Sequence, residues 1–447
     1  MRRLGSLPAW RGLAGLFAAG LLAAAPAAHA VPSFAVQTGR PCEACHVGGL
    51  GPQLTPFGRE FKLHGYTTRA VSFNVPLAGF IQGSYTRTNK GQSPPTPHFA
   101  TDDNFAVDQI SLFVAGGFGD HLGAFIQTTY DGVAHAFHWD NLDIRAVTNA
   151  TIAGVKSVLG ISLNNNPTVQ DPFNTLPAWG FPYTSSALAP ALPATPFIGN
   201  LAQTTVGLTG YAWINDRTYV EFGGYRSPSS HFLTHWGADP TAPGNIDGVA
   251  PYGRVAYDWN LGEKNVEIGA FAMDARIFPG HDQSTGLTDH YDDVGMDTSF
   301  QYTAPNHDVV TFNARYTHES QRLNASTALG LAANPRQNLQ DLRVDASYYW
   351  RDKVGFSTQV FYTWGSPDEL LYQGSRRNRP DSSGILFQID DTPFGNGRSP
   401  FGQRFNLRVG VQYTDYFQFS GAATNFDRMG RNASDNNTLR FFVWIYY

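Results

Sequence analysis

The chain has 447 residues and a formal net charge of −5 at pH 7, from 31 Lys and Arg against 36 Asp and Glu. This acidity excludes a nucleic-acid-binding protein, because such proteins carry a basic surface. No stretch after residue 30 contains about eighteen consecutive apolar residues, which excludes a membrane-spanning helix. Aromatic residues reach 14% and charged residues only 15%, so the chain is poor in charge for a soluble protein of this length.

Residues 1–30 have the pattern of a secretion signal. Arginines at positions 2, 3 and 11 precede the apolar segment GLAGLFAAGLLAAA, and AHA ends at Ala30 as a small-x-small cleavage site. The apolar run is too short to span a bilayer, so we expect cleavage and not a membrane anchor. The mature chain then begins near Val31. Loss of three arginines lowers the Lys and Arg count from 31 to 28 and the net charge to −8.

The two cysteines of the chain lie in PCEACH at residues 41–46. Cys42, Cys45 and His46 match C-x-x-C-H, the attachment signature of c-type haem. In this pattern two thioethers hold one edge of a porphyrin, and the adjacent imidazole binds the iron. A disulfide would leave the histidine as a coincidence, and a structural zinc site would need a second pair of ligands with suitable spacing. We therefore predict one covalently attached haem c, with His46 as a metal ligand.

We assign residues 31–70 to a small cytochrome c segment with one haem. So short a segment buries too little surface to form a self-sufficient domain. The haem must therefore supply much of its core, and we expect the rest of the chain to supply the remainder.

The segment LTPFGREFKLHGY predicts one short helix within this region. Thr55 is the expected N-cap, and Gly65 ends the helix. Phe57, Phe61 and His64 are spaced i, i+4 and i+7, so we expect them to share one face that packs on the porphyrin.

His64 is the preferred candidate for the sixth iron ligand. After Met1 the next methionine is Met273, so the cytochrome segment has no methionine ligand to offer. The alternatives are that His64 is a surface residue at a helix C-terminus, that the iron site is open, or that the ligand comes from the barrel wall. The wall candidates are His98, His135 and His138.

Residues 71–447 alternate between apolar and polar side chains, which predicts strands with one face toward lipid and one toward water. The clearest examples are residues 310–317, 341–350 and 404–413. We expect about sixteen strands, and a barrel of that size leaves an aqueous lumen. The expected starts are near residues 72, 105, 121, 141, 150, 201, 217, 249, 264, 289, 306, 339, 353, 383, 403 and 436.

The connections alternate between short turns and long polar loops, as in barrels with periplasmic turns and outer loops. An even strand count then places both termini in the periplasm. The connection at residues 390–402, DDTPFGNGRSPFG, is too long for this rule.

The longest connection, residues 166–200, is rich in proline and aromatic residues. We expect it to fold into the lumen as a constriction, and the alternative is a disordered surface loop. Acidic segments at residues 101–103 and 289–293 are weak candidates for an iron site. Three pairs of opposite charge are expected inside the lumen: Asp143 with Arg145, Asp274 with Arg276, and Arg343 with Asp345.

The chain closes on TLRFFVWIYY at residues 438–447. Leu439, Phe441 and Val443 fall on one face of this strand, and Arg440 and Phe442 fall on the other. An aromatic terminal strand with this alternation is typical of bacterial outer-membrane barrels. The predicted fold is therefore an all-β outer-membrane barrel whose lumen is plugged by a small helical haem segment.

Several segments resemble the outer-membrane cytochrome–porin fusion family, proteins with one haem that are proposed as iron oxidases. The shared pieces are QTG, CEACH, LTPFGR-x-FKL-x-GY, NNNPTVQDPFNT-x-PAWGFPY and GRNASDNNTL. They extend over the whole mature chain. One departure is HVGGLGPQL, which lacks an aromatic–proline step expected before Leu-Thr-Pro. This departure affects the packing at the haem edge and not the attachment.

The resemblance implies oxidation of extracellular Fe(II), an iron:cytochrome c oxidoreductase-like activity that passes electrons to a periplasmic cytochrome c. It also implies a bacterial outer-membrane location in contact with lipid. Two alternatives stay open. The chain could export electrons to an external acceptor, or it could be a solute porin with a structural or sensory haem.

Overall fold

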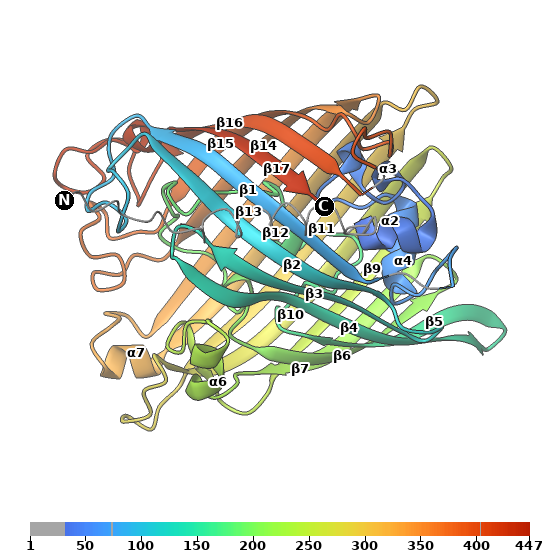
Figure 1. Cartoon of the computed structure of the whole chain (residues 1–447). Helices are drawn as coiled ribbons and strands as arrows, with labels where there is room; N and C mark the ends of the chain where they lie inside the picture. The colour runs from blue at the N-terminus through green and yellow to red at the C-terminus, as the bar shows by residue number, and fades with distance from the viewer. Residues whose placement is uncertain (1–31, 73–74, 403) are drawn as a thin grey trace, which may run out of the picture.

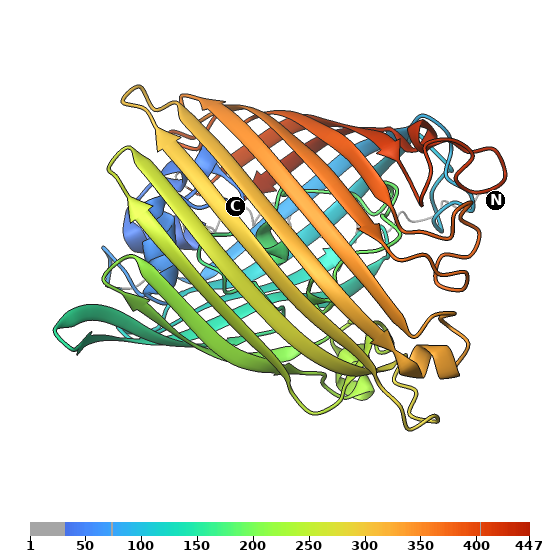
Figure 2. The same cartoon turned by 180° about the vertical axis from the view of Figure 1, so that it is seen from behind.

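The computed structural model describes residues 32–72, 75–402 and 404–447, with side-chain detail from Ser33 onward. Figures 1 and 2 show a barrel of tilted strands with short helices inside one end. The predicted secretion signal, residues 1–30, lies outside the described residues.

The barrel wall is made of antiparallel strands that pair in chain order. Their bounds are β1 (Leu77–Thr88), β2 (Asn104–Gly117), β3 (Leu122–Asp131), β4 (Ala136–Ile152), β5 (Val155–Asn164), β6 (Val206–Ile214), β7 (Thr218–Arg226), β8 (Gly244–Ile246), β9 (Ala250–Asn260), β10 (Lys264–Pro279), β11 (Asp289–Thr303), β12 (Val309–Leu323), β13 (Arg336–Trp350), β14 (Val354–Gly365), β15 (Ser382–Asp391), β16 (Asn406–Gln418) and β17 (Thr438–Tyr446).

The barrel is closed, because β1 pairs with both β2 and β17. The three-residue strand β8 only extends the edge of β10, so sixteen full strands form the wall within the described chain. This confirms the predicted all-β barrel and its strand count. Each predicted start lies within about five residues of the observed one, because the alternation of side chains marks a strand directly.

The two faces of the wall differ in polarity. In β17, Arg440 and Phe442 are buried toward the lumen, whereas Phe441 and Val443 are exposed on the outside. Phe222 of β7 is 70% exposed on the same outer surface. An apolar exterior with a polar interior is what a membrane-embedded barrel requires. Among the described residues, no helix has the length and apolarity needed to cross a membrane.

The N-terminal segment, residues 32–70, lies in the lumen at the end of the barrel that carries the short turns (Figure 1), and we call it the plug. Its helices are α2 (Pro32–Thr38), α3 (Cys42–Cys45), η1 (Val47–Gly49) and α4 (Pro56–Leu63). The remaining helices are η2 (Pro177–Trp179), α5 (Phe197–Asn200), α6 (Ser230–His235), α7 (Asn324–Ala328) and η3 (Ala433–Asn436). Helices α6 and α7 lie at the opposite end.

Hydrogen bonds join the plug to lumen-facing side chains around the wall. The Tyr66 hydroxyl donates to Asp143 at 2.6 Å, and Arg145 donates to the Lys62 carbonyl at 3.0 Å. On the other side of the lumen, the Gly48 amide donates to Asp352 at 2.5 Å. Because these groups are buried, each bond that is lost would leave an unsatisfied polar group.

The long connection between β15 and β16 has a structural reason to depart from the rule of short turns. The amide of Glu43 in the plug donates to the Gly395 carbonyl at 3.1 Å. A Cβ at Gly49 would lie 2.7 Å from the Cα of Gly395. This connection therefore holds the plug by close backbone contact, which a two-residue turn could not reach.

Helix α4 begins and ends as predicted, but its inward face differs from the prediction. Thr55 caps the helix by accepting from the Gly58 amide, and Gly65 takes a positive φ of 62° after its end. Phe57 is exposed, so the expected stripe of Phe57, Phe61 and His64 does not face one surface. Gly58 is decisive here, because a Cβ at this position would overlap the carbonyl of Cys45. Because Gly58 has no side chain, that side of α4 packs directly against α3.

The connection between β5 and β6, residues 165–205, lies inside the lumen, and we call it the inner loop. Val169, Leu176 and Ile198 of this loop are fully buried. Leu176 and Ile198 pack against lumen-facing Phe271 and Met273 of β10. Apolar contacts of this kind explain the aromatic and proline-rich composition of the loop.

We predict that Gly48→Ala loosens the plug. Gly48 has a φ of 70°, and a Cβ would overlap the ring of Tyr349 on the barrel wall. Strain and overpacking of this kind each cost about 1–3 kcal/mol. Limited proteolysis should release residues from the plug faster than in the unsubstituted protein, while the barrel stays intact.

Gly286→Ala is the matched control. Gly286 has a φ of 67°, and nothing lies within 4 Å of a Cβ added there. This variant carries the same backbone strain without the clash. Equal cleavage rates for the two variants would contradict the proposed close approach at Gly48.

Candidate functional site

Cys42, Cys45 and His46 open into one cavity, with a volume of about 330 Å³. This volume lies within the range of small-molecule sites, about 300–1,000 Å³. The plug, the barrel wall and the inner loop all contribute to its lining. The structure thus brings three of the four predicted site residues together around a single enclosed space.

The two thiols lie on one side of the short helix α3. Cys42 and Cys45 are i and i+3, which places both side chains on the same face of a helical turn. Neither forms a disulfide. Burial raises the pKa of the Cys42 thiol and raises the pKa of the Cys45 thiol to about 12, so both thiols stay protonated in this folded arrangement.

His46 is partly buried, and its Nδ1 atom is inaccessible to solvent and makes no hydrogen bond of good geometry among the described residues. Burial lowers the pKa of this imidazole to about 4, so the ring is neutral near pH 7. A neutral imidazole with an available ring nitrogen is the form that binds a metal ion.

Aromatic side chains make up most of the cavity wall opposite α3. Phe80 of β1 packs against Trp444 and Tyr446 of β17, with ring centroids 5.6 and 5.1 Å apart. Phe113 lies 5.5 Å from Phe80. These rings are tilted or edge-to-face relative to one another, and together they give this part of the cavity an apolar lining.

Lys62 of α4 carries the one amino group that lines the cavity within the described chain. Its Nζ donates to the carbonyls of Val169 and Asp171 in the inner loop at 2.8 and 2.7 Å. It also lies 5.3 Å from the ring centroid of Trp179. Lys62 therefore ties the plug to the inner loop at the edge of the cavity.

His64 is the fourth predicted residue, and the structure does not bring it into the cavity. Its Nδ1 atom lies 2.9 Å from the Glu60 carbonyl and 3.5 Å from the Glu60 carboxylate. The inward face of α4 presents Gly58, Phe61 and Lys62 instead. His98, His135 and His138 do not line the cavity either.

The donor set fits a haem attached through two thioethers. Both thiols and the neutral His46 imidazole face the same space, and Nδ1 of His46 is a buried polar atom without a partner. The aromatic residues around them suit a porphyrin. The fit concerns Cys42, Cys45 and His46, and it does not extend to His64.

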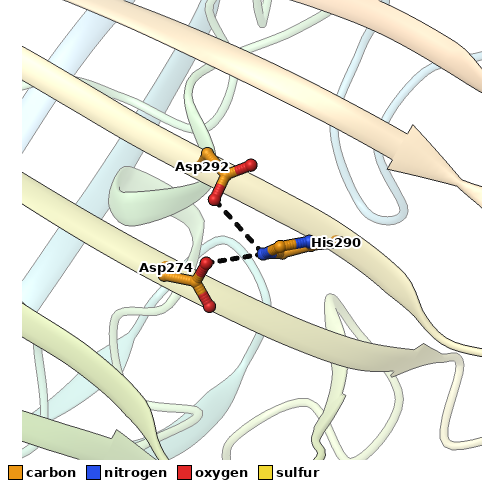
Figure 3. Close-up of side chains that lie close together, drawn as sticks. All are labelled: Asp274, His290 and Asp292. Carbon is orange, nitrogen blue, oxygen red and sulfur yellow. Dashed lines mark hydrogen bonds and ion pairs between the residues drawn. The ribbon is translucent and has the colours of Figure 1, made fainter.

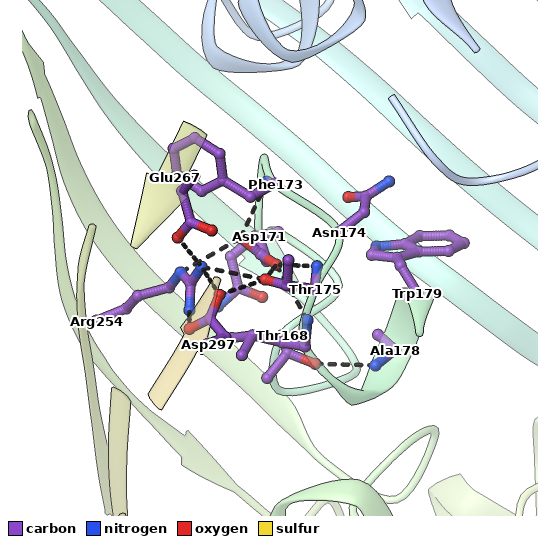
Figure 4. Close-up of polar contacts among 12 residues, drawn as sticks. Thr168, Asp171, Phe173, Asn174, Thr175, Ala178, Trp179, Arg254, Glu267 and Asp297 are labelled. Carbon is purple, nitrogen blue, oxygen red and sulfur yellow. Dashed lines mark hydrogen bonds and ion pairs between the residues drawn. The ribbon is translucent and has the colours of Figure 1, made fainter. Parts of the chain in front are cut away.

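One buried cluster of charges fixes the inner loop against the wall (Figure 4). Arg254 of β9 forms ion pairs with Asp171 of the loop at 3.3 Å, with Glu267 at 3.2 Å and with Asp297 at 2.8 Å. The Asp171 carboxylate also accepts from the amides of Phe173 and Thr175 at 3.1 Å each. Asp171 therefore fixes the conformation of the loop and also holds it to the wall. No pattern in the sequence indicated that Asp171 pairs with Arg254.

The residues of two of the three expected charge pairs face the lumen, but only one of these pairs forms as predicted. Asp143 and Arg145 form a fully buried pair at 2.8 Å. Arg343 also faces the lumen, but its partner is Asp341 at 2.7 Å, and Asp345 instead accepts from Asn313.

The third predicted pair, Asp274 with Arg276, does not face the lumen, so this prediction was wrong. Glu267, Phe271 and Met273 of β10 are buried toward the lumen, so the alternate positions 274 and 276 face outward. They lie near the end of β10 that carries long connections, where polar residues can face the outside of a barrel.

Asp274 belongs to an outward-facing cluster with His290 and Asp292 (Figure 3). The His290 Nε2 atom lies 2.6 Å from Asp274 and 3.2 Å from Asp292. Arg322 forms a further pair with Asp292 at 2.9 Å. The cluster satisfies its own charges on the outer surface, away from the cavity in the lumen.

The acidic segment at residues 101–103 is also committed to local contacts. Asp102 accepts from the Thr88 amide at 2.7 Å, and Asp103 accepts from the Tyr85 hydroxyl at 2.7 Å. In the segment 289–293, Asp289 and Asp293 are buried in the lumen and accept from backbone amides. His290 and Asp292 of the second segment belong to the outward-facing cluster with Asp274 described above.

Several solved outer-membrane proteins are similar to this chain. OmpT of Vibrio cholerae, folded in vitro, shares 10% identity over 83% of this chain and 96% of its own, with a TM-score of 0.43. An anion-selective porin from Comamonas acidovorans shares 12% identity over 83% and 98%, with a TM-score of 0.47. The channel DcaP of Acinetobacter baumannii shares 10% over 83% and 96%, with a TM-score of 0.45. No protein-family model and no curated protein matches the chain.

We predict that Arg254→Gln releases the inner loop. The change leaves three buried carboxylates without their shared cation, and breaking a buried ion pair in this way costs about 3–5 kcal/mol. Protease cleavage within residues 165–205 should become fast, and the midpoint of denaturant unfolding should fall.

Arg217→Gln is the control, because Arg217 is exposed in the turn between β6 and β7. It removes the same charge without touching the cluster. If Arg254→Gln is as resistant to protease as this control, the cluster does not hold the loop.

Proposed function

We propose that this protein is an outer-membrane electron-transfer protein, in which a haem c segment lies inside a porin-like barrel. The arrangement of Cys42, Cys45 and His46 around one aromatic cavity carries this proposal. When bound, a haem c supplies one-electron redox chemistry. Cys42, Cys45 and His46 would hold the haem, and His64 is left out because its ring contacts Glu60 instead.

The position of the plug supports transfer across the membrane. The cavity lies toward the end of the barrel with short turns, which we assign to the periplasm together with both termini. The inner loop lies between this cavity and the rest of the lumen. Electrons that enter from the outside therefore have to cross the rest of the lumen, past the inner loop, before they reach the plug.

We further propose Fe(II) as the extracellular donor and a periplasmic cytochrome c as the acceptor. Fe(III) precipitates at neutral pH, so a cell gains by taking the electron while the metal stays outside. Plug and inner loop both occupy the lumen, which argues against a wide pore for solutes. The chemistry is a one-electron oxidation, Fe(II) to Fe(III), with no bond formed to the protein.

The first test concerns the haem. The chain, produced in a host that matures c-type cytochromes, should keep its haem on a denaturing gel stained for peroxidase activity. The double variant Cys42→Ala, Cys45→Ala should lose this staining. His64→Ala is the control and should keep both the staining and the absorption spectrum, because its ring lies outside the cavity.

Two results would contradict the haem assignment. The first is loss of haem from the unsubstituted chain on denaturation, and the second is unchanged staining of the double variant. A changed absorption spectrum in His64→Ala would indicate that His64 binds the iron. It would then follow that α4 turns when haem is bound.

The second test concerns the conduit. Liposomes carry the protein in their membrane and a soluble cytochrome c inside, and Fe(II) is added outside. We expect reduction of the enclosed cytochrome while iron stays outside. Passage of small sugars without any reduction would favour the solute-porin alternative instead.

A further inference from the structure

A second cavity, of about 260 Å³, lies in the lumen on the other side of the inner loop. Its wall side is formed by lumen-facing residues of β12, β13 and β14, including Asn313, Arg315 and Asp345. Its other side is formed by both arms of the inner loop. These strand positions fall near the middle of each strand, so the cavity lies at mid-depth in the barrel.

One segment of the inner loop separates the two cavities. Gly180 and Pro182 line both of them. Trp179 borders the cavity of the two thiols, and Phe181 borders the second cavity. A single segment of the inner loop therefore separates the two cavities.

The second cavity contains two arginines and two aspartates, but their charges are not equally matched. Asp341 accepts from Arg343 at 2.7–3.1 Å and from the Thr363 hydroxyl at 2.8 Å. Arg343 and Asp341 therefore satisfy each other at short distance. Asp345 accepts from the Asn313 amide at 2.8 Å.

Arg315 is left with weak contacts. It reaches Asp341 only at 3.5 Å and the Thr175 carbonyl at 3.3 Å. Its Nε atom is buried without a partner among the described residues, and its side chain is 12% exposed. A guanidinium has five N–H donors. Two of those of Arg315 are used and its Nε donor is buried, so one donor on each terminal nitrogen stays available beside the cavity.

We propose that this second cavity binds a small carboxylate anion, held by Arg315. A planar guanidinium pairs with a carboxylate through two parallel hydrogen bonds, which is the geometry that its free edge offers. Asp345 and Gln359 add acceptors and donors for hydroxyl groups of the same ligand. The volume limits the ligand to a few carbon atoms and excludes a protein donor.

The binding site itself does not depend on the proposed function, but its use does. If the protein is an electron conduit, the carboxylate anion is the small organic acid that chelates Fe(II) on entry. The complex would then rest one thickness of chain from the haem segment. On losing one electron to that segment it becomes an Fe(III) complex with one negative charge fewer, so its attraction to Arg315 falls and the product leaves.

Binding of citrate to the purified full chain in detergent, measured by calorimetry, tests the site. Arg315→Gln keeps a donor toward Thr175 and removes the charge, and we expect it to weaken binding about tenfold or more. Arg322→Gln is the matched control, because Arg322 lies on the outer face of the same strand and is half-exposed. It should bind citrate like the unsubstituted chain.

A second variant fills the cavity without changing its charge. Gly199 lines the cavity, and the nearest atom to an added Cβ is 3.7 Å away. Gly199→Leu should therefore fold and still lose most of the citrate binding. The proposed site would be wrong if the Arg315, Arg322 and Gly199 variants all bound citrate with equal affinity. It would also be wrong if no chain bound citrate.

The haem spectrum separates this inference from the proposed function. Dithionite reduces any accessible haem, and Fe(II)–citrate tests donor entry. If citrate binds as expected but neither Fe(II) nor Fe(II)–citrate reduces the haem, the site stands and the conduit fails. If Fe(II)–citrate reduces the unsubstituted chain and the Gly199→Leu variant at the same rate, the donor enters elsewhere and the second cavity is not its site.

Discussion

The arrangement of the lumen depends on one buried guanidinium. Arg254 joins Asp171 of the inner loop to Glu267 and Asp297 of the wall. Neither the arginine nor the carboxylates could be buried alone without a large desolvation cost. Loop and wall are therefore stable only together, and because the loop forms one side of both cavities, the shape of each cavity follows from this contact.

The interior is held mainly by directed polar contacts, and this differs from the core of a soluble domain. Plug carbonyls and amides meet lumen side chains such as Arg145 and Asp352. Hydrogen bonds of this kind depend on both angle and distance, so the plug fits in one orientation. Close approaches at Gly48, Gly49 and Gly58 then set how near each helix comes to its neighbours.

The barrel could be predicted from the sequence, whereas part of the site could not. Period-two alternation is a local property of each strand, so its signal survives without any knowledge of neighbours. The inward face of α4 was predicted wrongly, because large residues suggested the packing face and the decisive residue was the small Gly58. Asp274 was placed inside because alternation does not tell which face is inner near the end of a strand. The partners of Asp171 and Arg315 are distant in sequence, so no local pattern predicts these contacts.

The aromatic cavity is assembled from both ends of the chain. Phe80 belongs to the first strand, Trp444 and Tyr446 belong to the last, and the two strands pair with each other. The enclosure is complete only when the final strand has joined the first. In the closed barrel Cys45 is partly buried, and desolvation raises its pKa to about 12, so it has little thiolate to react. The haem attachment that we propose would thus have to take place before the barrel closes, in an order of attachment first and membrane insertion second.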